Sequence, residues 1–525
     1  LKPTFKEIIP PLNPYQFNYQ EYLVKQGIEH QVFVEHHQVK ALGATNSSLK
    51  GIASRFRNYI ITSLKKFSFN KDELGVINAL LLGQRQDISK ELITEYSRAG
   101  AIHILAVSGL HVGVIMFVLS FLLKPIERFK KGRFLKACLI VLFLWIFAFI
   151  AGLSASVVRA VTMFTFLTIG NIFSAKTNVK FSIITSMLFL LLIKPMFLFD
   201  VGFQLSYLAV FGIIWIQPKL YAIWSPKLKF IDKLWQLITV SIAAQAGILP
   251  LSIYYFNQFP SLFILSNLVI IPFLGLILFG GILVILLSVL DILPQFVAKM
   301  YGNIIHLMNQ FVGWISQQES FLIKDISMSF LIMILFYVLL VCGVLFLIRK
   351  TTRRLIYFLM SIVVLQGIYM YEKIQKSNKK EFVVFHKSRK SLLGNRVGDT
   401  LQLLHNLDSI EFSKSTTTIP YVINENIEQV IESESQNIFQ VFNHKILVID
   451  SLGVYQIEGV NHPIIILQSS PKINLTRLIH QLKPKQIIAD GSNYKSYINR
   501  WEVICEKEKI PFHYTGQKGA FVLKK

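Results

Sequence analysis

Two polar side chains near the start of an apolar stretch have the spacing expected of a hydrolytic pair. Ser108 lies three residues before His111, and residues three apart share one face of a helix. A hydroxyl beside an imidazole can serve as a nucleophile and its general base. No third group that would orient the imidazole is identifiable, so the pair alone is weak evidence for hydrolysis. In the same stretch, Gly109 and Gly113 form a small-xxx-small pair that permits close helix approach.

Two further polar stretches bring opposite charges into apolar surroundings. Residues 152–159 end in Arg159, about one helical turn inside the segment that follows. A later segment begins at Asp200, and Gln204 and Tyr207 follow it on one helical stripe. Both segments start on the same side, so we expect Arg159 and Asp200 at similar depth. Ionisable groups inside a membrane are costly and indicate function by default. The pair either holds two helices together or lines a path.

The segments that carry these residues are long and apolar. Hydrophobic residues make up 53% of the 525-residue chain and charged residues 16%, and the mean hydropathy is +0.50. A membrane helix needs about 20 apolar residues. The sequence therefore predicts an α-helical polytopic membrane protein with about ten spans. These are residues 102–123, 134–151, 155–174, 180–193, 201–216, 234–256, 263–290, 300–318, 327–348 and 355–371.

The charge distribution orients these spans. Residues 102–371 hold 20 basic and 6 acidic side chains, and 17 of the 20 basic residues fall in alternate loops, on one side of the predicted membrane. Cytoplasmic loops are enriched in Lys and Arg. We therefore expect both terminal regions to lie outside the cytoplasm, and most of the net charge of +24 to reflect membrane topology.

The whole sequence divides into four predicted regions. Residues 1–50 are typical of the end of a small β domain. Residues 51–101 read as amphipathic helices on the membrane surface. Residues 102–371 form the membrane domain, and residues 372–525 a soluble α/β domain. Three scattered cysteines indicate neither disulfides nor a metal site, and the start at Leu1 leaves open whether upstream sequence is missing.

Read together, the polar stretches resemble the ComEC family, the inner-membrane channel of natural transformation. Residues 105–113 are similar to the signature of its competence domain, and residues 152–159 and 200–206 match two further blocks in the expected order. Residues 13–28 resemble the segment that follows the OB-like extracytoplasmic domain of that family. The resemblance covers residues 10–350.

The resemblance implies a channel in the bacterial inner membrane that passes one DNA strand into the cytoplasm. It also implies an extracytoplasmic DNA-binding competence protein and a cytoplasmic helicase-like motor as partners, and it leaves homo-oligomerisation open. We assign the matched residues to the translocation path or its packing, with no catalytic role and no cofactor. They are Ser108, Gly109, His111, Arg159, Asp200 and Gln204.

The C-terminal domain departs from the pattern of relatives that end in a metallo-β-lactamase-like domain. Residues 482–493 and 514–523 are similar to later strands of that domain. The opening strand, residues 382–388, lacks the Asp-rich motif, and no His-x-His cluster occurs. Two-metal hydrolysis needs such a cluster. We therefore expect a degenerate domain without metal or nuclease activity, in which Asp450 and Asp490 are caps or turn formers.

Two other functions stay open. One is a membrane enzyme that uses Ser108 and His111 on a lipid-linked or peptide substrate. The other is a transporter or flippase for a different polyanion. Loss of function in Ser108→Ala would favour the enzyme. Tolerance of that change together with sensitivity at Arg159 would favour a conduit.

Overall fold

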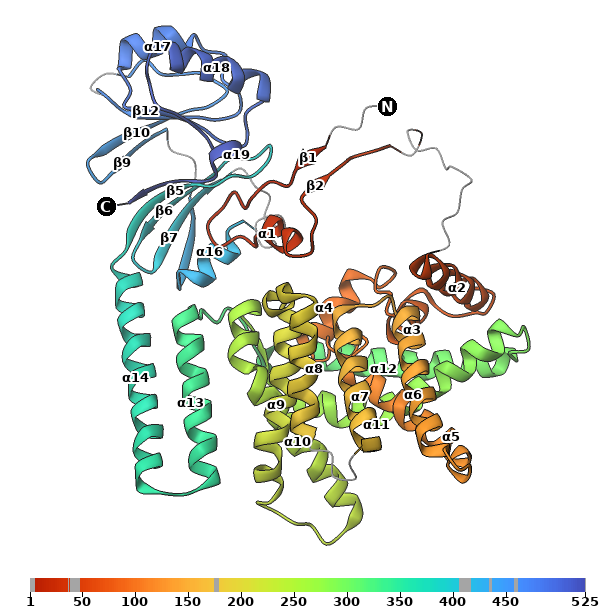
Figure 1. Cartoon of the computed structure of the whole chain (residues 1–525). Coiled ribbons are helices and arrows are strands. Elements are labelled where there is room, and N and C mark those ends of the chain that lie inside the picture. Colours follow the sequence, from red (N-terminus) through yellow and green to blue (C-terminus); the bar gives the residue numbers. More distant parts are fainter. Residues whose placement is uncertain are drawn as a thin grey trace. The chain divides into compact units, whose positions relative to one another are not determined.

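The computed structural model divides the chain into two compact units (Figure 1). The first comprises Leu1–Gln38, Ser327–Leu335 and Leu359–Lys525, and the second comprises Val39–Ile326 and Phe336–Phe358. The structure describes residues 5–35, 37, 48–173, 179–405, 417–433, 437–457 and 461–524. Residues 1–4, 36 and 38–47 of the predicted β domain and residue 174 of a predicted span lie outside this range.

The second unit is helical. Its helices are α2 (Leu49–Leu64), α3 (Lys71–Leu82), α4 (Lys90–Arg98), α5 (Gly109–Leu122), α6 (Gly132–Ile150), α7 (Ala155–Phe173), α8 (Val179–Ile193), α9 (Val201–Tyr221), α10 (Lys229–Phe256), α11 (Phe263–Val289) and α12 (Gln295–Ser316). The hairpin of α13 (Phe330–Ile348) and α14 (Thr352–Ser377) belongs partly to each unit.

Each predicted span falls on one of the helices α5 to α14. Within the described residues, seven are long and apolar enough to cross a membrane: α6, α7, α9, α10, α11, α13 and α14. Helices α5 and α8 are apolar but shorter, and α12 is amphipathic. Crossing by these three helices stays a prediction. The first predicted span is wrong at its start, because the helix begins at Gly109 instead of residue 102.

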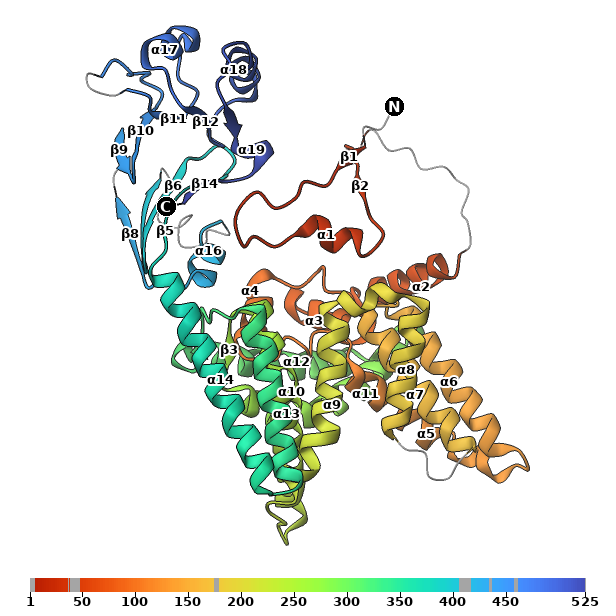
Figure 2. The same cartoon turned by 60° about the vertical axis from the view of Figure 1, so that its left-hand side comes forward.

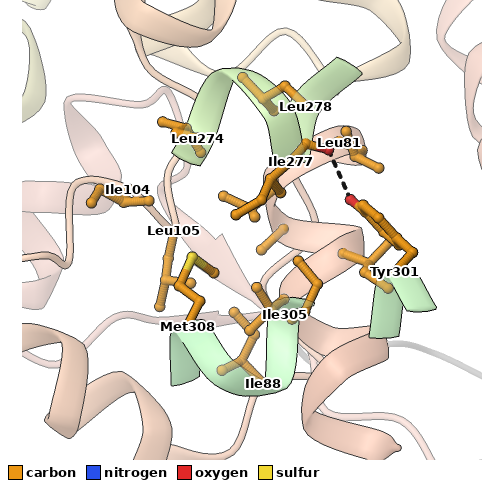
Figure 3. Close-up of a cluster of buried hydrophobic side chains, with 14 of the residues drawn as sticks. Leu81, Ile88, Ile104, Leu105, Leu274, Ile277, Leu278, Tyr301, Ile305 and Met308 are labelled. Carbon is orange, nitrogen blue, oxygen red and sulfur yellow. Dashed lines mark hydrogen bonds between the residues drawn. The ribbon is translucent and has the colours of Figure 1, made fainter. Parts of the chain in front are cut away.

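The core of this unit joins the helices of residues 51–101 to α11 and α12 (Figure 3). The last seven residues of α3, Val76 to Leu82, are all buried. Leu81 packs in a cluster with Leu278 of α11 and Ile305 of α12. Tyr301 of α12 donates a hydrogen bond to the carbonyl of Ile277 at 3.0 Å. The placement of residues 51–101 on a membrane surface stays a prediction, but α3 is a core element.

Helices α9 and α10 pack closely because each presents glycine to the other. A Cβ atom at Gly212 would lie 2.4 Å from the carbonyl oxygen of Ala243, and one at Gly247 would lie 2.4 Å from that of Leu208. Real side chains do not tolerate such contacts, so the two backbones meet directly. Small residues at helix contacts are typical of membrane proteins.

The C-terminal part of the first unit contains two five-stranded sheets, as predicted for a soluble α/β domain. The first sheet has the order β14-β5-β6-β7-β8 and the second the order β13-β12-β11-β10-β9. The strands are β5 (Lys380–Val384), β6 (Leu392–Val397), β7 (Thr400–His405), β8 (Gln429–Ser433), β9 (Ile438–Val441), β10 (His444–Ile449), β11 (Ile464–Leu467), β12 (Gln486–Ala489), β13 (Phe512–Tyr514) and β14 (Phe521–Lys524).

The two sheets pack face to face with helices outside. Phe382 and Leu404 of the first sheet meet Ile446 and Ile466 of the second in one buried cluster. Helices α17 (Leu475–Leu482) and α18 (Lys495–Lys507) cover the second sheet, whereas α16 (Ile419–Asn424) lies against the first (Figure 2). All four residues of β11 are buried, which explains why its sequence is continuously apolar.

The N-terminal part of the first unit is small. Strands β1 (Lys6–Glu7) and β2 (His30–Gln31) form one antiparallel pair, and α1 (Tyr19–Val24) lies between them in sequence. Within the described residues this two-stranded pair is the only sheet of the segment. It does not confirm the predicted OB-like remnant.

Candidate functional site

Ser108 and His111 are in contact, but not on a common helix face. Helix α5 begins at Gly109, and Ser108 precedes it in extended conformation as the N-cap. The Ser108 Oγ lies 3.0 Å from His111 Nδ1, and the Ser108 amide donates to the same nitrogen at 3.2 Å. This arrangement resembles a capping box with histidine in place of Glu or Gln. The prediction of a shared helix face is wrong, because the chain enters the helix only after the serine.

The His111 side chain is completely buried in the first turn of α5. Its Nε2 atom is buried and has no hydrogen-bond partner among the described residues. A buried polar atom without a partner is rare and requires explanation. No hydrogen bond from the described part of the chain therefore orients this imidazole at its far nitrogen.

Helix α7 packs directly on this turn. Ser156 donates a hydrogen bond to the carbonyl of Val107 at 2.8 Å, which ties the start of α7 to the residue before the Ser108 cap. Gly109 faces Ala160, whose Cβ would lie 4.0 Å from an added side chain. An added methyl group would therefore make only an ordinary van der Waals contact, and a packing role for Gly109 stays a prediction.

Arg159 and Asp200 also meet, as their predicted depths suggested. Arg159 Nη1 lies 3.4 Å from Asp200 Oδ1, and the arginine side chain is 4% exposed. Asp200 is the N-cap of α9 and accepts a stronger bond from the Phe203 amide at 2.6 Å. The carboxylate thus mainly caps the start of α9, and its contact with the Arg159 guanidinium is long.

The guanidinium of Arg159 is incompletely satisfied. Its Nε is buried without a hydrogen-bond partner among the described residues. The Phe203 ring lies 5.8 Å from its central carbon, within reach of a cation–π interaction. Gly202 is also close, since an added Cβ would stand 3.7 Å from Nη2. A buried arginine with unused donors is suited to a planar anionic group such as a phosphate or carboxylate.

The other two residues of the predicted stripe point to different partners. Gln204 donates to the carbonyl of Leu198 at 2.8 Å, and the hydroxyl of Tyr207 lies 3.1 Å from that of Ser186. Asp200 is outside the helix. The predicted stripe therefore holds Gln204 and Tyr207 within the helix, whereas Asp200 is the N-cap that precedes it.

Sequence reasoning missed Ser156 and Phe203 as parts of this site. Ser156 lies three residues before Arg159 on α7 and connects it to the Ser108 turn. That spacing was a usable signal, since both residues lie within one polar stretch. Phe203 gave no signal, because its apolar side chain is indistinguishable in sequence from those that face lipid. The set formed by Ser108, His111, Ser156, Arg159 and Asp200 is called the polar site below.

Possible metal ligands lie apart from one another in the described ranges of the C-terminal domain. Among the described residues, no group of three or more His, Cys, Asp or Glu side chains is placed to hold a metal ion. His386 Nδ1 lies 3.0 Å from the Thr515 hydroxyl. Asp450 accepts from the Leu452 amide at 2.9 Å, and Asp490 from the Ser492 amide at 3.0 Å. Both aspartates are thus turn formers, as predicted.

Comparison with known proteins places the chain in a family. Residues 80–350 match the family model described as Competence protein, and residues 382–525 match the ComEC C-terminal domain. The ComE operon protein 3 of Bacillus subtilis is 29% identical over 312 residues, which cover 59% of this chain and 38% of that protein. Recombination protein 2 of Haemophilus influenzae is 26% identical over 271 residues, which cover 48% of this chain and 33% of that protein.

The chain therefore spans well under half the length of either relative. No solved structure matches it at a significant level. The Competence model nevertheless covers more than half of the 525 residues and includes all three polar stretches in order. By this match, the chain belongs to the competence protein family.

Proposed function

We propose that this chain takes part in DNA uptake during natural transformation, as a conduit that passes single-stranded DNA across the bacterial inner membrane. Membership in the competence family supports the role in uptake. The conduit rests on the polar site, whose Arg159 lies on α7, one of the helices long and apolar enough to cross a membrane. A path for a polyanion needs positive or polar groups in such surroundings.

The observation that carries the proposal is the state of Arg159. A guanidinium that is 4% exposed, with one carboxylate contact at 3.4 Å and an unpaired Nε, is poorly compensated within the described part of the chain. Burying a charge without full pairing is costly. A passing phosphate would supply the missing acceptor, and it would do so without reading the base.

The orientation and partners belong to the same proposal. The clustering of basic residues in alternate loops supports an orientation with both terminal regions outside the cytoplasm. Single-stranded DNA would then be delivered by an extracytoplasmic DNA-binding protein and drawn inward by a cytoplasmic motor. In this scheme the cytoplasmic motor supplies the energy for transport.

A second candidate is a membrane enzyme, favoured by the 3.0 Å contact between Ser108 Oγ and His111 Nδ1. The same contact has a structural explanation, because Nδ1 also accepts from the Ser108 amide in the helix cap. Within the described ranges, no hydrogen-bond partner reaches the Nε2 atom of this imidazole. We therefore place the conduit first.

The test is an uptake assay with marked DNA in cells that lack the gene, with and without the restored chain. Transformants and extracytoplasmic DNA are scored separately. We expect DNA to accumulate outside the inner membrane while transformants disappear. Normal transformation in the deleted strain would contradict the proposal, and an accompanying lipid or envelope defect would favour the enzyme or a flippase.

A further inference from the structure

The N-terminal segment is bound to the C-terminal domain by backbone contacts. The amide of Ala520 donates to the carbonyl of Leu12 at 2.7 Å. The side chain of Asn13 pairs with both backbone groups of His386: Nδ2 donates to the carbonyl and Oδ1 accepts from the amide, each at 2.8 Å. An amide side chain that pairs in this way reproduces one unit of strand pairing. Asn13 is 8% exposed, so these bonds are shielded from water.

A buried carboxylate provides the second attachment. Glu425, at the end of α16, accepts from the Tyr15 hydroxyl and from Lys379 Nζ, each at 2.5 Å. Its other oxygen accepts from Arg396 Nη1 at 2.5 Å. Tyr15 itself has a φ of +61°, a backbone conformation that is unusual for a bulky residue and needs support from its surroundings. Docking on Glu425 supplies that support.

The same network continues into the membrane hairpin. Arg396 is fully buried, and its Nη2 donates to the carbonyl of Lys376 at the end of α14 at 2.7 Å. At the start of α13, Ser327 donates to the carbonyl of Asn424 at 3.3 Å, and Ser329 donates to Glu372 of α14 at 2.7 Å. The outer ends of both hairpin helices are therefore joined to the domain that holds the N-terminal segment.

We infer that the C-terminal domain is a clamp, which holds residues 12–16 on one side of the membrane and fixes them to the α13–α14 hairpin. Two segments in direct contact must lie in one compartment. The chain between Tyr15 and His386 must then cross the membrane an even number of times. This role requires neither a metal nor catalysis, and nothing in the family match assigns it.

An even number of crossings constrains the three uncertain helices. The seven long apolar helices are an odd number, and adding the shorter α5 and α8 gives nine, which is odd again. Seven or nine crossings would each place Tyr15 and His386 on opposite sides of the membrane. If all seven cross, then an odd number of α5, α8 and α12 must cross with them. Including all three gives ten crossings, which agrees with the distribution of basic loops.

A disulfide between the backbone-paired positions tests the clamp in the full chain. We would combine Leu12→Cys with Ala520→Cys after replacing Cys138 and Cys342 by Ala. Cys505 can stay, because burial raises the pKa of its thiol to about 12 and keeps it protonated. We expect oxidation in intact cells to give a cross-linked chain of altered mobility. The pair Leu12→Cys and Val503→Cys, on the outer helix α18, should not cross-link.

Tyr15→Phe removes only the hydroxyl that reaches Glu425. We expect it to reduce the yield of the 12–520 cross-link severalfold. Tyr19→Phe, the same change at a half-exposed position of the same segment, should leave the yield unchanged. An unchanged yield in Tyr15→Phe would overturn the role of Glu425 in the clamp.

Labelling with a membrane-impermeant maleimide tests the shared compartment. Single cysteines at exposed Tyr19 and Val503 should react from the same side. Labelling from opposite sides would overturn both the clamp and the even count. If both single cysteines are labelled from the same side but the cross-link between positions 12 and 520 does not form, the clamp is overturned. Neither measurement uses DNA, so failure here is distinguishable from failure of the proposed conduit.

Discussion

Arg159 Nη1 lies 3.4 Å from Asp200 Oδ1, whereas the Phe203 amide lies 2.6 Å from the same oxygen. The aspartate is therefore mainly a helix cap, and the arginine is only partly neutralised by it. An ion pair whose sole role was to hold α7 against α9 would have a shorter contact and more of its donors satisfied. The long contact and the unpaired Nε support the proposal that the guanidinium binds a passing phosphate.

Arg159→Lys should separate these two roles. Lysine keeps the charge but loses the planar fork that binds a phosphate in two places. We expect transformation to fall on the order of tenfold, equivalent to about 1.4 kcal/mol, while the purified chain remains folded. Asp200→Asn should be milder, because an amide oxygen can still cap α9. If transformation fell in both variants only because less of the chain folded, Arg159 would be a packing residue.

Ser108→Ala should be tolerated in a conduit. The change removes the hydroxyl contact with His111, and loss of an N-cap costs about 1 kcal/mol of stability. We expect near-normal transformation with a slightly lower melting temperature in detergent. A folded Ser108→Ala chain without any transformation would favour the enzyme.

The α9–α10 contact should be intolerant of even one methyl group. Gly247→Ala would bring a Cβ to 2.4 Å from the Leu208 carbonyl, so the helices must separate. Overpacking of this kind costs about 1–3 kcal/mol. Gly275→Ala on α11 is a matched control, because nothing lies within 4 Å of its added Cβ. We expect the unfolding temperature in detergent to fall in Gly247→Ala and to stay unchanged in Gly275→Ala.

Arg396 should be essential for the C-terminal domain. It is fully buried between Glu381 and Glu425. Arg396→Met removes the buried one of two cations that contact both carboxylates and leaves only Lys379 beside them. Breaking a buried ion pair costs about 3–5 kcal/mol. Limited proteolysis should then cut residues 380–433 readily. Resistance equal to that of the unchanged chain would show that the network contributes little.

Asp490 gives a pH-dependent prediction. Burial raises the pKa of Asp490 from 3.8 to about 6, although bonds from neighbouring hydroxyls partly oppose this. Because the folded pKa lies above the unfolded value, protonated Asp490 contributes to the free energy of unfolding. This contribution is fully present below pH 3.8 and is lost as pH rises through 6. Asp490→Asn should therefore stabilise the domain at neutral pH by up to about 3 kcal/mol and have little effect near pH 3.5. Hydrogen exchange of β12 measures the difference, and equal effects at both pH values would contradict it.

The sequence predicted the helical membrane domain and the α/β domain because apolar run length and burial of β strands are local properties. All ten predicted spans fall on helices. The start of α5 was misplaced, because Ser108 caps this helix and apolar periodicity does not mark a cap. The span predicted from residue 201 begins where α9 begins. Clamp contacts such as Asn13 with His386 join residues 373 positions apart, and no local pattern indicates them.

Part of the polar site was predictable for a specific reason. Arg159 and Asp200 are ionisable residues in apolar segments, and such residues must find partners at their own depth. Their contact followed from the direction of the two segments. Ser156 and Phe203 were not predictable, because a serine hydroxyl and an aromatic ring occur widely in membrane helices and acquire a role only through packing.

The most direct test of the central claim is photo-cross-linking of labelled DNA during uptake. A cross-linking amino acid would replace Ser154, which is exposed and lies 3.4 Å from the hydroxyl of Ser156. The same amino acid at Phe181, an exposed apolar position on α8, is the control. The conduit predicts DNA adducts at Ser154 and none at Phe181. If uptake is normal but neither position gives an adduct, DNA does not pass the polar site.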